Sequence, residues 1–160
     1  MLTAPDAGWT DFQLGSKETR YSLSYLTDIA VEWLDQAIHG LETLEPFSVH
    51  GFCEPGRMIC TVSYWNCYII FEGDDRNDKC ESVYTVHENM IEFCRKLYSD
   101  IDSNLEEWVH WNDVYLNEEV EEAFKEAANR KKKALQSRLD TFQKLIADKS
   151  ECFDEHHCFF

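Results

Sequence analysis

Apolar residues recur every three or four positions between residues 21 and 39, which is the spacing of one face of an α-helix. This face consists of Leu26, Ile29, Ala30, Trp33, Leu34, Ala37, Ile38 and Leu41. Asp28, Glu32 and Asp35 fall between these positions and are expected to face water. Gly40 is typical of a helix end. The pattern therefore predicts an amphipathic helix over residues 21–39.

The pattern changes between residues 47 and 86, where short apolar and aromatic segments alternate with turn residues. The segments are FSVHGFC (47–53), MICTVSYW (58–65), CYIIFE (67–72) and CESVYTV (80–86). Their connections are short, which favours an antiparallel meander. Pro55-Gly56 fits the centre of a type II turn. The sequence leaves open whether residues 58–72 form one strand or a hairpin that turns at Trp65-Asn66.

Helical periodicity returns after residue 86. Thr85 and Glu88 form a T-x-x-E capping box ahead of a predicted helix. Its apolar face is Met90, Ile91, Cys94, Leu97, Tyr98 and Ile101. Asn117 is a suitable N-cap for a long last helix over residues 118–148. The apolar face of this last helix is thin, so we expect it to pack by one narrow seam or to reach beyond the body.

These elements predict an α+β fold. We expect an antiparallel β-meander of three to four strands packed against helices, with a long carboxy-terminal helix. Residues 1–150 are interpreted as one domain, which suits a chain of 160 residues. Within it, residues 1–19 are an expected irregular lead-in, and residues 112–148 an expected helical extension. Residues 151–160 form a tail that contains cysteine and histidine.

Charge is the strongest global feature of the sequence. The chain has 31 acidic and 15 basic residues, a formal net charge of −16. Such a field repels nucleic acid and anionic membranes, and it speeds the encounter with a basic partner. The basic run 130–133 follows acids one turn earlier, so intrahelical ion pairs are its expected role.

The amino-terminal residues lack the basic start and apolar core of a secretory signal, so we expect a soluble cytoplasmic protein. Seven cysteines are then interpreted as reduced thiols rather than disulfides.

The tail ECFDEHHCFF has residue types that suit a metal ion. Cys152, His156, His157 and Cys158 lie within seven positions. A structural zinc site needs four ligands in a tetrahedron, and no second close pair such as C-x-x-C completes the set. We therefore predict no metal ligand and no cofactor. The default interpretation is a plain tail whose phenylalanines fold back on the body.

Catalytic patterns are not found in the sequence. No cysteine or serine stands in a known nucleophile turn, and no glycine-rich phosphate loop is present. His50 alternates with Val49 in a strand pattern, and His87 stands at a helix start. We predict no catalytic residue.

A binding surface for a basic protein is suggested by acids near aromatic residues, because tryptophan is favoured at the centre of interfaces. Trp108 and Trp111 are also ordinary candidates for the core. The candidate partner-binding residues are Asp74, Asp75, Asp78, Glu106, Glu107, Trp108, Trp111 and Asp113.

The order of YLTDIAVEWLDQAI, a meander opened by FSVHGFCEPGR, and TVHENMIEFCRKLYSDI resembles small bacterial α+β families. Some of these are similar to the immunity proteins of polymorphic toxin systems. The resemblance covers residues 21–111 and rests on layout and apolar spacing. It implies tight binding of a toxin rather than catalysis.

We therefore expect a non-catalytic acidic protein-binding module, with an immunity protein that neutralises a basic toxin as its specific form. One alternative is a metal-binding protein or metal-dependent enzyme that uses the tail. Another is a scaffold that dimerises through the long helix. The sequence leaves the oligomeric state open.

If Asp74, Asp75 and Asp78 attract the partner, reversing all three to Lys should slow association and flatten its dependence on salt, because steering of this kind is screened by ions. Stopped-flow binding at several ionic strengths measures this. An unchanged association rate would exclude the loop.

Overall fold

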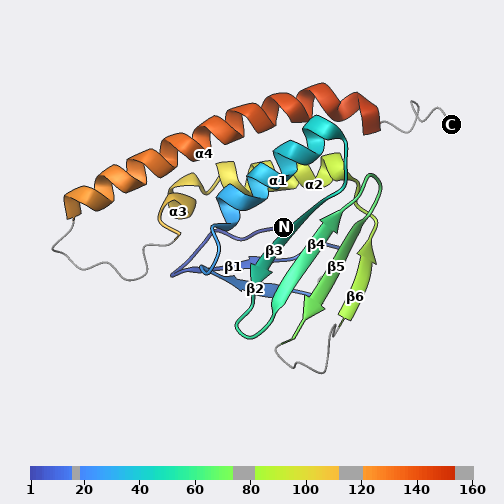
Figure 1. The fold of residues 1–160 in the computed structure, drawn as a ribbon, viewed down its shortest axis with the longest axis horizontal. Helices are drawn as coiled ribbons and strands as arrows, with labels where there is room; N and C mark the ends of the chain where they lie inside the picture. The colour runs from blue at the N-terminus through green and yellow to red at the C-terminus, as the bar shows by residue number, and fades with distance from the viewer. Residues whose placement is uncertain (16–18, 74–81, 112–120, 154–160) are drawn as a thin grey trace.

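The computed structural model describes residues 1–15, 19–73, 82–111 and 121–153. In chain order its strands are β1 (Trp9–Phe12), β2 (Tyr21–Ser24), β3 (Phe47–Phe52), β4 (Arg57–Val62), β5 (Cys67–Glu72) and β6 (Ser82–Val86). Its helices are α1 (Ile29–Thr43), α2 (Met90–Asp102), α3 (Leu105–Val109), α4 (Glu121–Lys149) and a short 3₁₀ turn, η2 (Ser150–Phe153). The α+β fold with a long carboxy-terminal helix is confirmed (Figure 1).

The amino-terminal segment is a hairpin, so the prediction of an irregular lead-in was wrong. β1 pairs antiparallel with β2, with Trp9 opposite Ser24 and Phe12 opposite Tyr21. The predicted helix therefore starts eight residues late, at Ile29. Asp28 sets this start, because its carboxylate accepts a hydrogen bond from the backbone N of Val31 at 3.4 Å.

Gly40 lies inside α1 rather than at its end. The helix continues to Thr43, and Leu44 follows it in the left-handed conformation with φ of 56°. Gly40 is needed for close packing, because an added Cβ would stand 2.2 Å from Cδ1 of Phe47.

The four-stranded sheet has the order β3-β4-β5-β6 and is antiparallel throughout, as predicted. Residues 58–72 form a hairpin rather than one strand, closed by a hydrogen bond of 2.9 Å from the Ser63 N to the Asn66 O. The turn before β4 is present: Gly56 has φ of 87°, the positive value that a type II turn requires at its third residue, and the preceding Glu54–Pro55 bond is cis.

The start of α2 corrects the predicted capping box. Thr85 belongs to β6, where it lies opposite Tyr68. The cap is Asn89, whose side-chain oxygen accepts a hydrogen bond of 2.9 Å from the backbone N of Glu92. Asn89 therefore caps the helix in place of Thr85.

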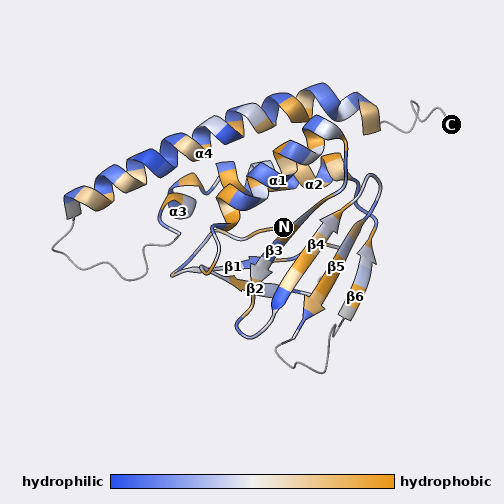
Figure 2. Ribbon diagram, viewed as in Figure 1, coloured by the Kyte–Doolittle hydropathy of each residue, from blue (hydrophilic) through white to orange (hydrophobic). Residues whose placement is uncertain are grey.

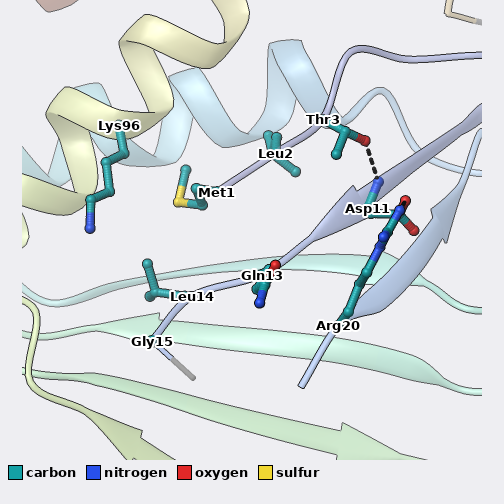
Figure 3. Close-up of a pocket in the computed structure, with 9 residues that line it drawn as sticks. All are labelled: Met1, Leu2, Thr3, Asp11, Gln13, Leu14, Gly15, Arg20 and Lys96. Atoms are coloured by element: carbon teal, nitrogen blue, oxygen red, sulfur yellow. Dashed lines mark hydrogen bonds and ion pairs between the residues drawn. The ribbon is translucent and has the colours of Figure 1, made fainter. Parts of the chain in front are cut away.

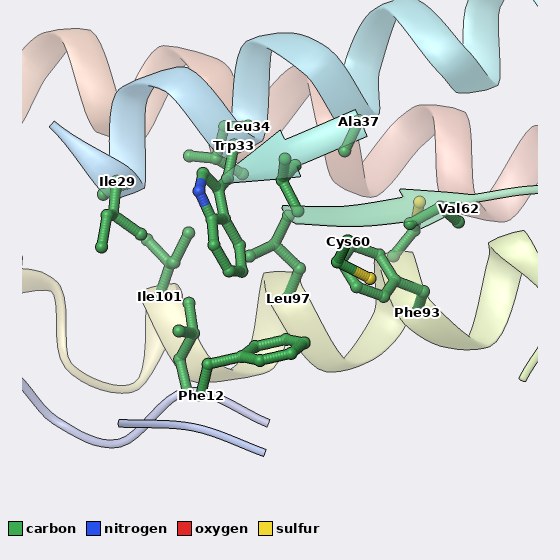
Figure 4. Close-up of a cluster of buried hydrophobic side chains, with 14 of the residues drawn as sticks. Phe12, Ile29, Trp33, Leu34, Ala37, Cys60, Val62, Phe93, Leu97 and Ile101 are labelled. Carbon is green, nitrogen blue, oxygen red and sulfur yellow. The ribbon is translucent and has the colours of Figure 1, made fainter. Parts of the chain in front are cut away.

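One face of the sheet carries the core, and helices α1 and α2 cover it (Figure 1). Alternate residues point inward, among them Val49, Met58, Cys60, Val62, Cys67 and Ile69. Trp33 of α1 stands at the centre and meets Phe12 of β1 edge to face, with ring centroids 5.5 Å apart (Figure 4). Its indole N donates to the carbonyl of His50 at 2.8 Å, so α1 is bonded to the edge of β3.

Helix α4 forms a third layer across α1, α2 and α3, so it lies on the body rather than extending from it (Figure 1). Its buried residues are Leu135, Leu139 and Phe142, which form the expected narrow seam. Much of the rest is hydrophilic (Figure 2). No helix in the described ranges has both the length and the apolar character to span a bilayer.

Three basic residues of α4 pair with acids of other elements, so the prediction of intrahelical pairs was wrong for Lys131 and Lys132. Lys131 pairs with Asp28 at 2.9 Å, Lys132 with Glu106 of α3, and Arg138 with Asp35 of α1 at 2.7 Å. The predicted intrahelical kind is represented by Arg130 and Glu126, which are 3.8 Å apart and exposed.

Substituting Gly40→Ala should lower the free energy of unfolding by about 1–2 kcal/mol. Overpacking a core costs about 1–3 kcal/mol, and so short a contact belongs in the upper part of that range, about 2–3 kcal/mol; the higher helix propensity of alanine returns about 1 kcal/mol of it. Urea denaturation measures the change. Asn129→Ala on the exposed side of α4 is the matched control and should be neutral or slightly stabilising. Equal stability of Gly40→Ala and the parent would contradict the contact with Phe47.

Candidate partner-binding groove

A groove with a volume of about 320 Å³ separates the first turn of the chain from helix α3. One wall is formed by Pro5, Asp6, Ala7 and Gly8, and the other by Glu106, Glu107, His110 and Trp111. Three carboxylates therefore stand around a space that accepts one long side chain. We define these eight residues as the acidic groove.

The first wall is a tight turn in an unusual conformation. Asp6 and Trp9 exchange two backbone hydrogen bonds of 2.8 Å, with Ala7 at φ of 46° and Gly8 at φ of 79° between them. Two positive φ values define a type I′ turn, which suits glycine and asparagine at both central positions. Ala7 is strained there, because its Cβ crowds the backbone in the left-handed region. The turn holds Asp6 at the groove and leaves Trp9 40% exposed beside it.

The second wall is fixed by the packing of α3 and the residues that follow it. Trp111 donates its indole N–H to the carbonyl of Thr27 at 2.8 Å, and its ring lies 5.2 Å from that of Trp108. Both indoles are buried, at 1% and 0% exposure. They anchor the wall from behind and direct Glu106 and Glu107 outward.

The three carboxylates of the groove differ in their partners. Glu106 is paired with Lys132 of α4. Asp6 and Glu107 have no ion pair among the residues that the structure describes. Two uncompensated negative charges therefore face one another across the groove, and a lysine or arginine side chain is the group that would neutralise them.

The structure divides the residues predicted to bind a partner. It brings Glu106 and Glu107 to the groove, as surface acids. It places Trp108 and Trp111 in the core, the ordinary interpretation of these residues, and Trp111 also lines the groove. Asp74, Asp75, Asp78 and Asp113 lie outside the described residues.

Sequence reasoning missed the first wall. The segment Asp6-Ala7-Gly8-Trp9 carries one glycine and no apolar period, so it resembles an irregular loop. The central pair of the turn is Ala7-Gly8 rather than the Asn-Gly or Asp-Gly that signals a type I′ turn, so no local signal marked it. The bridge between Leu2 and Phe12 beside it is visible only in the structure.

A second cavity, of about 350 Å³, lies between the amino-terminal segment, β1 and α2 (Figure 3). Its cations are already compensated. Arg20 is paired with Asp11, and Lys96 with Glu88. The hydrogen bond from Arg20 lowers the pKa of the Asp11 carboxyl. This cavity is therefore a less suitable site for an ion than the acidic groove.

Three of the described thiols, those of Cys53, Cys60 and Cys94, are poorly suited to nucleophilic chemistry. Burial raises the pKa of the Cys53 and Cys94 thiols, and contact with Cys67 together with burial raises that of Cys60. A raised pKa keeps these groups in the unreactive thiol form. His87 is hydrogen-bonded to Asn66 through Nδ1 at 2.8 Å.

The carboxy-terminal tail is described as far as Phe153. Phe153 is buried and stacks on Tyr64 with centroids 4.3 Å apart, and the Tyr64 hydroxyl donates to the Cys152 carbonyl at 2.9 Å. The expected return of a tail phenylalanine to the body is thus confirmed at this residue. His156, His157 and Cys158 lie outside the described residues. Within the described ranges, no three histidine, cysteine or acidic side chains gather as a metal site.

No family model, curated protein or solved structure matches the chain.

Replacing Ala7 with Gly should raise the free energy of unfolding by about 0.5–1 kcal/mol. Relief of left-handed strain is worth about 1–2 kcal/mol, and the greater freedom of glycine in the unfolded chain takes back about half of it. Thermal unfolding measures this, with Ala123→Gly on the exposed helix α4 as a control that should be destabilised. A destabilised Ala7→Gly variant would contradict the type I′ turn.

Proposed function

We propose that this protein is a non-catalytic binding module for a basic protein, and that it receives a lysine or arginine of that partner in the acidic groove. In the form implied by its resemblance, the partner is a toxin and the module is an immunity protein. The neutralising action is then to occupy the surface that the toxin needs for its own anionic substrate.

The observation that carries this proposal is the distribution of charge. Three basic side chains of α4, those of Lys131, Lys132 and Arg138, are paired with Asp28, Glu106 and Asp35. These cations are therefore compensated within the fold, while the chain as a whole keeps a net charge of −16. Asp6 and Glu107 are acids that this arrangement leaves uncompensated and close together.

The shape of the groove supports the same proposal. Its second wall is supported by a buried tryptophan pair, so Glu106 and Glu107 stand on a packed helix rather than on a free loop. Preorganised charges lose little entropy when a partner binds. Trp9, partly exposed beside the groove, supplies an aromatic surface of the kind that is enriched at protein interfaces.

The partner is identified by purifying the tagged protein gently from its own host and recording its native mass. A complex with one basic protein at equal stoichiometry supports the proposal. A mass increase of one zinc ion, lost when residues 154–160 are deleted, would support the metal-binding alternative instead. A homodimer would support the scaffold.

Once the partner is identified, the double variant Asp6→Asn and Glu107→Gln should bind it about tenfold more weakly, a loss of about 1.4 kcal/mol. The reason is the loss of two negative charges that face the bound cation. Isothermal titration calorimetry measures the affinity, and unfolding curves show that both variants fold.

Glu42→Gln combined with Glu45→Gln is the matched control. It changes the net charge equally at the far end of α1, a helix of 15 residues that is about 22 Å long. It should leave the affinity nearly unchanged at moderate salt, where charges this distant are screened. An equal loss of affinity in both double variants would mean that overall charge, and not the acidic groove, attracts the partner.

A further inference from the structure

The two edges of the four-stranded sheet have different neighbours. At one edge, β3 lies beside β2, and its His50 carbonyl is bonded to the Trp33 indole. At the other edge, β6 has β5 as its strand neighbour and no second neighbour among the described residues (Figure 1). A strand edge of this kind presents unpaired backbone groups that can accept another strand.

The direction of these groups follows from the hairpin between β4 and β5. In an antiparallel pair of strands, hydrogen-bonded and non-hydrogen-bonded residue pairs alternate. Ser63 and Asn66 form a hydrogen-bonded pair at the turn. The pairs Val62–Cys67 and Cys60–Ile69 are therefore not hydrogen-bonded between β4 and β5. Cys67 and Ile69 therefore bond to β6, at Val86 and Tyr84.

The intervening residues Val83 and Thr85 turn their N–H and C=O groups away from the sheet. By the same alternation, the His50 carbonyl points outward at the opposite edge, where it accepts the hydrogen bond from the Trp33 indole. Among the described residues, no hydrogen bond engages the outward groups of Val83 or Thr85.

The side chains beside this edge are apolar and accessible. Val83 is 61% exposed, and the paired residues Ile70 and Ile59 continue its row across the outer face of the sheet. Tyr68, in the neighbouring row, is 38% exposed. The sequence of β6, SVYTV, contains none of the lysine, proline or acidic residues that usually protect an edge strand.

We propose that the edge of β6 binds an extended segment of another protein by strand addition. The segment would exchange hydrogen bonds with Val83 and Thr85 and place a β-branched side chain beside Val83, extending the apolar row. Basic residues at its ends suit the net charge of −16.

A second copy of the chain is a poorer occupant. Two chains of charge −16 repel each other. A five-residue edge also buries far less than the roughly 800 Å² per partner of a standard stable interface. This edge is a different surface from the acidic groove, since α3 and β6 lie on opposite sides of the molecule in Figure 1. Binding at one surface can therefore be tested independently of binding at the other.

The test uses the full chain and the peptide Lys-Thr-Val-Thr-Val-Thr-Lys as the probe. Its valine amides would face β6 when the valine side chains extend the row. Methylation of the valine nitrogens should therefore abolish binding. Methylation of the nitrogen of the central threonine should leave the affinity within about twofold, because that amide points to solvent.

A matched pair of protein variants tests the other side of the contact. Thr85→Pro removes an outward N–H and leaves the bonds to β5, so it should fold and bind the peptide about threefold to tenfold more weakly. Thr85→Ala keeps the N–H and should bind as the parent does. Amide exchange by NMR should show Val83 and Thr85 fast in the free protein and slow with the peptide.

Several results would overturn the proposal. No binding of the peptide, or equal binding of both methylated forms, would exclude backbone pairing. Slow exchange of the Val83 and Thr85 amides in the free protein would mean that the chain itself covers the edge. A concentration-dependent dimer lost in Thr85→Pro would make a second copy the occupant. Peptide binding should persist in the Asp6→Asn and Glu107→Gln variant, which separates this inference from the proposed function.

Discussion

The docking of helix α4 onto the three other α-helices determines how charge is arranged over this protein. Its seam of Leu135, Leu139 and Phe142 is fully buried. Burying such a side chain contributes about 1.5–3 kcal/mol, whereas an exposed ion pair contributes about 0–1 kcal/mol. The apolar seam therefore supplies most of the free energy that holds α4 on the other helices. The ion pairs of Lys131, Lys132 and Arg138 fix its position along them.

Because of this docking, positive and negative side chains have different roles. Three cations of α4 are used within the fold, where they pair with Asp28 and Asp35 of α1 and its cap and with Glu106 of α3. Acids that are not needed for the fold stay on the surface. The acidic groove forms where this surplus meets a rigid wall, since Trp111 is bonded to the loop before α1 and supports α3. The proposed attraction of a basic partner thus depends on contacts that are themselves structural.

The sequence was informative where one face of an element is buried and the other is solvated. The alternation in residues 47–86 predicted the meander, and the period of residues 90–101 predicted α2. It was misleading where local and tertiary effects compete. Tyr21 to Ser24 fit a helical period, but pairing with β1 draws them into a strand, and Leu26 is 54% exposed. Gly40 resembles a helix end, yet the approach of Phe47 explains it. Acids of the groove could be named, but the turn opposite them depends on long-range pairing that no local pattern reveals.

We propose that the surplus negative charge of this protein attracts a basic partner. The most direct measurement is the association rate constant of the co-purified partner across a range of ionic strength. We expect fast association at low salt and a steep fall in the rate constant as salt increases, because counterions screen charges over about 10 Å at 0.1 M. A rate that does not change with ionic strength would contradict the claim.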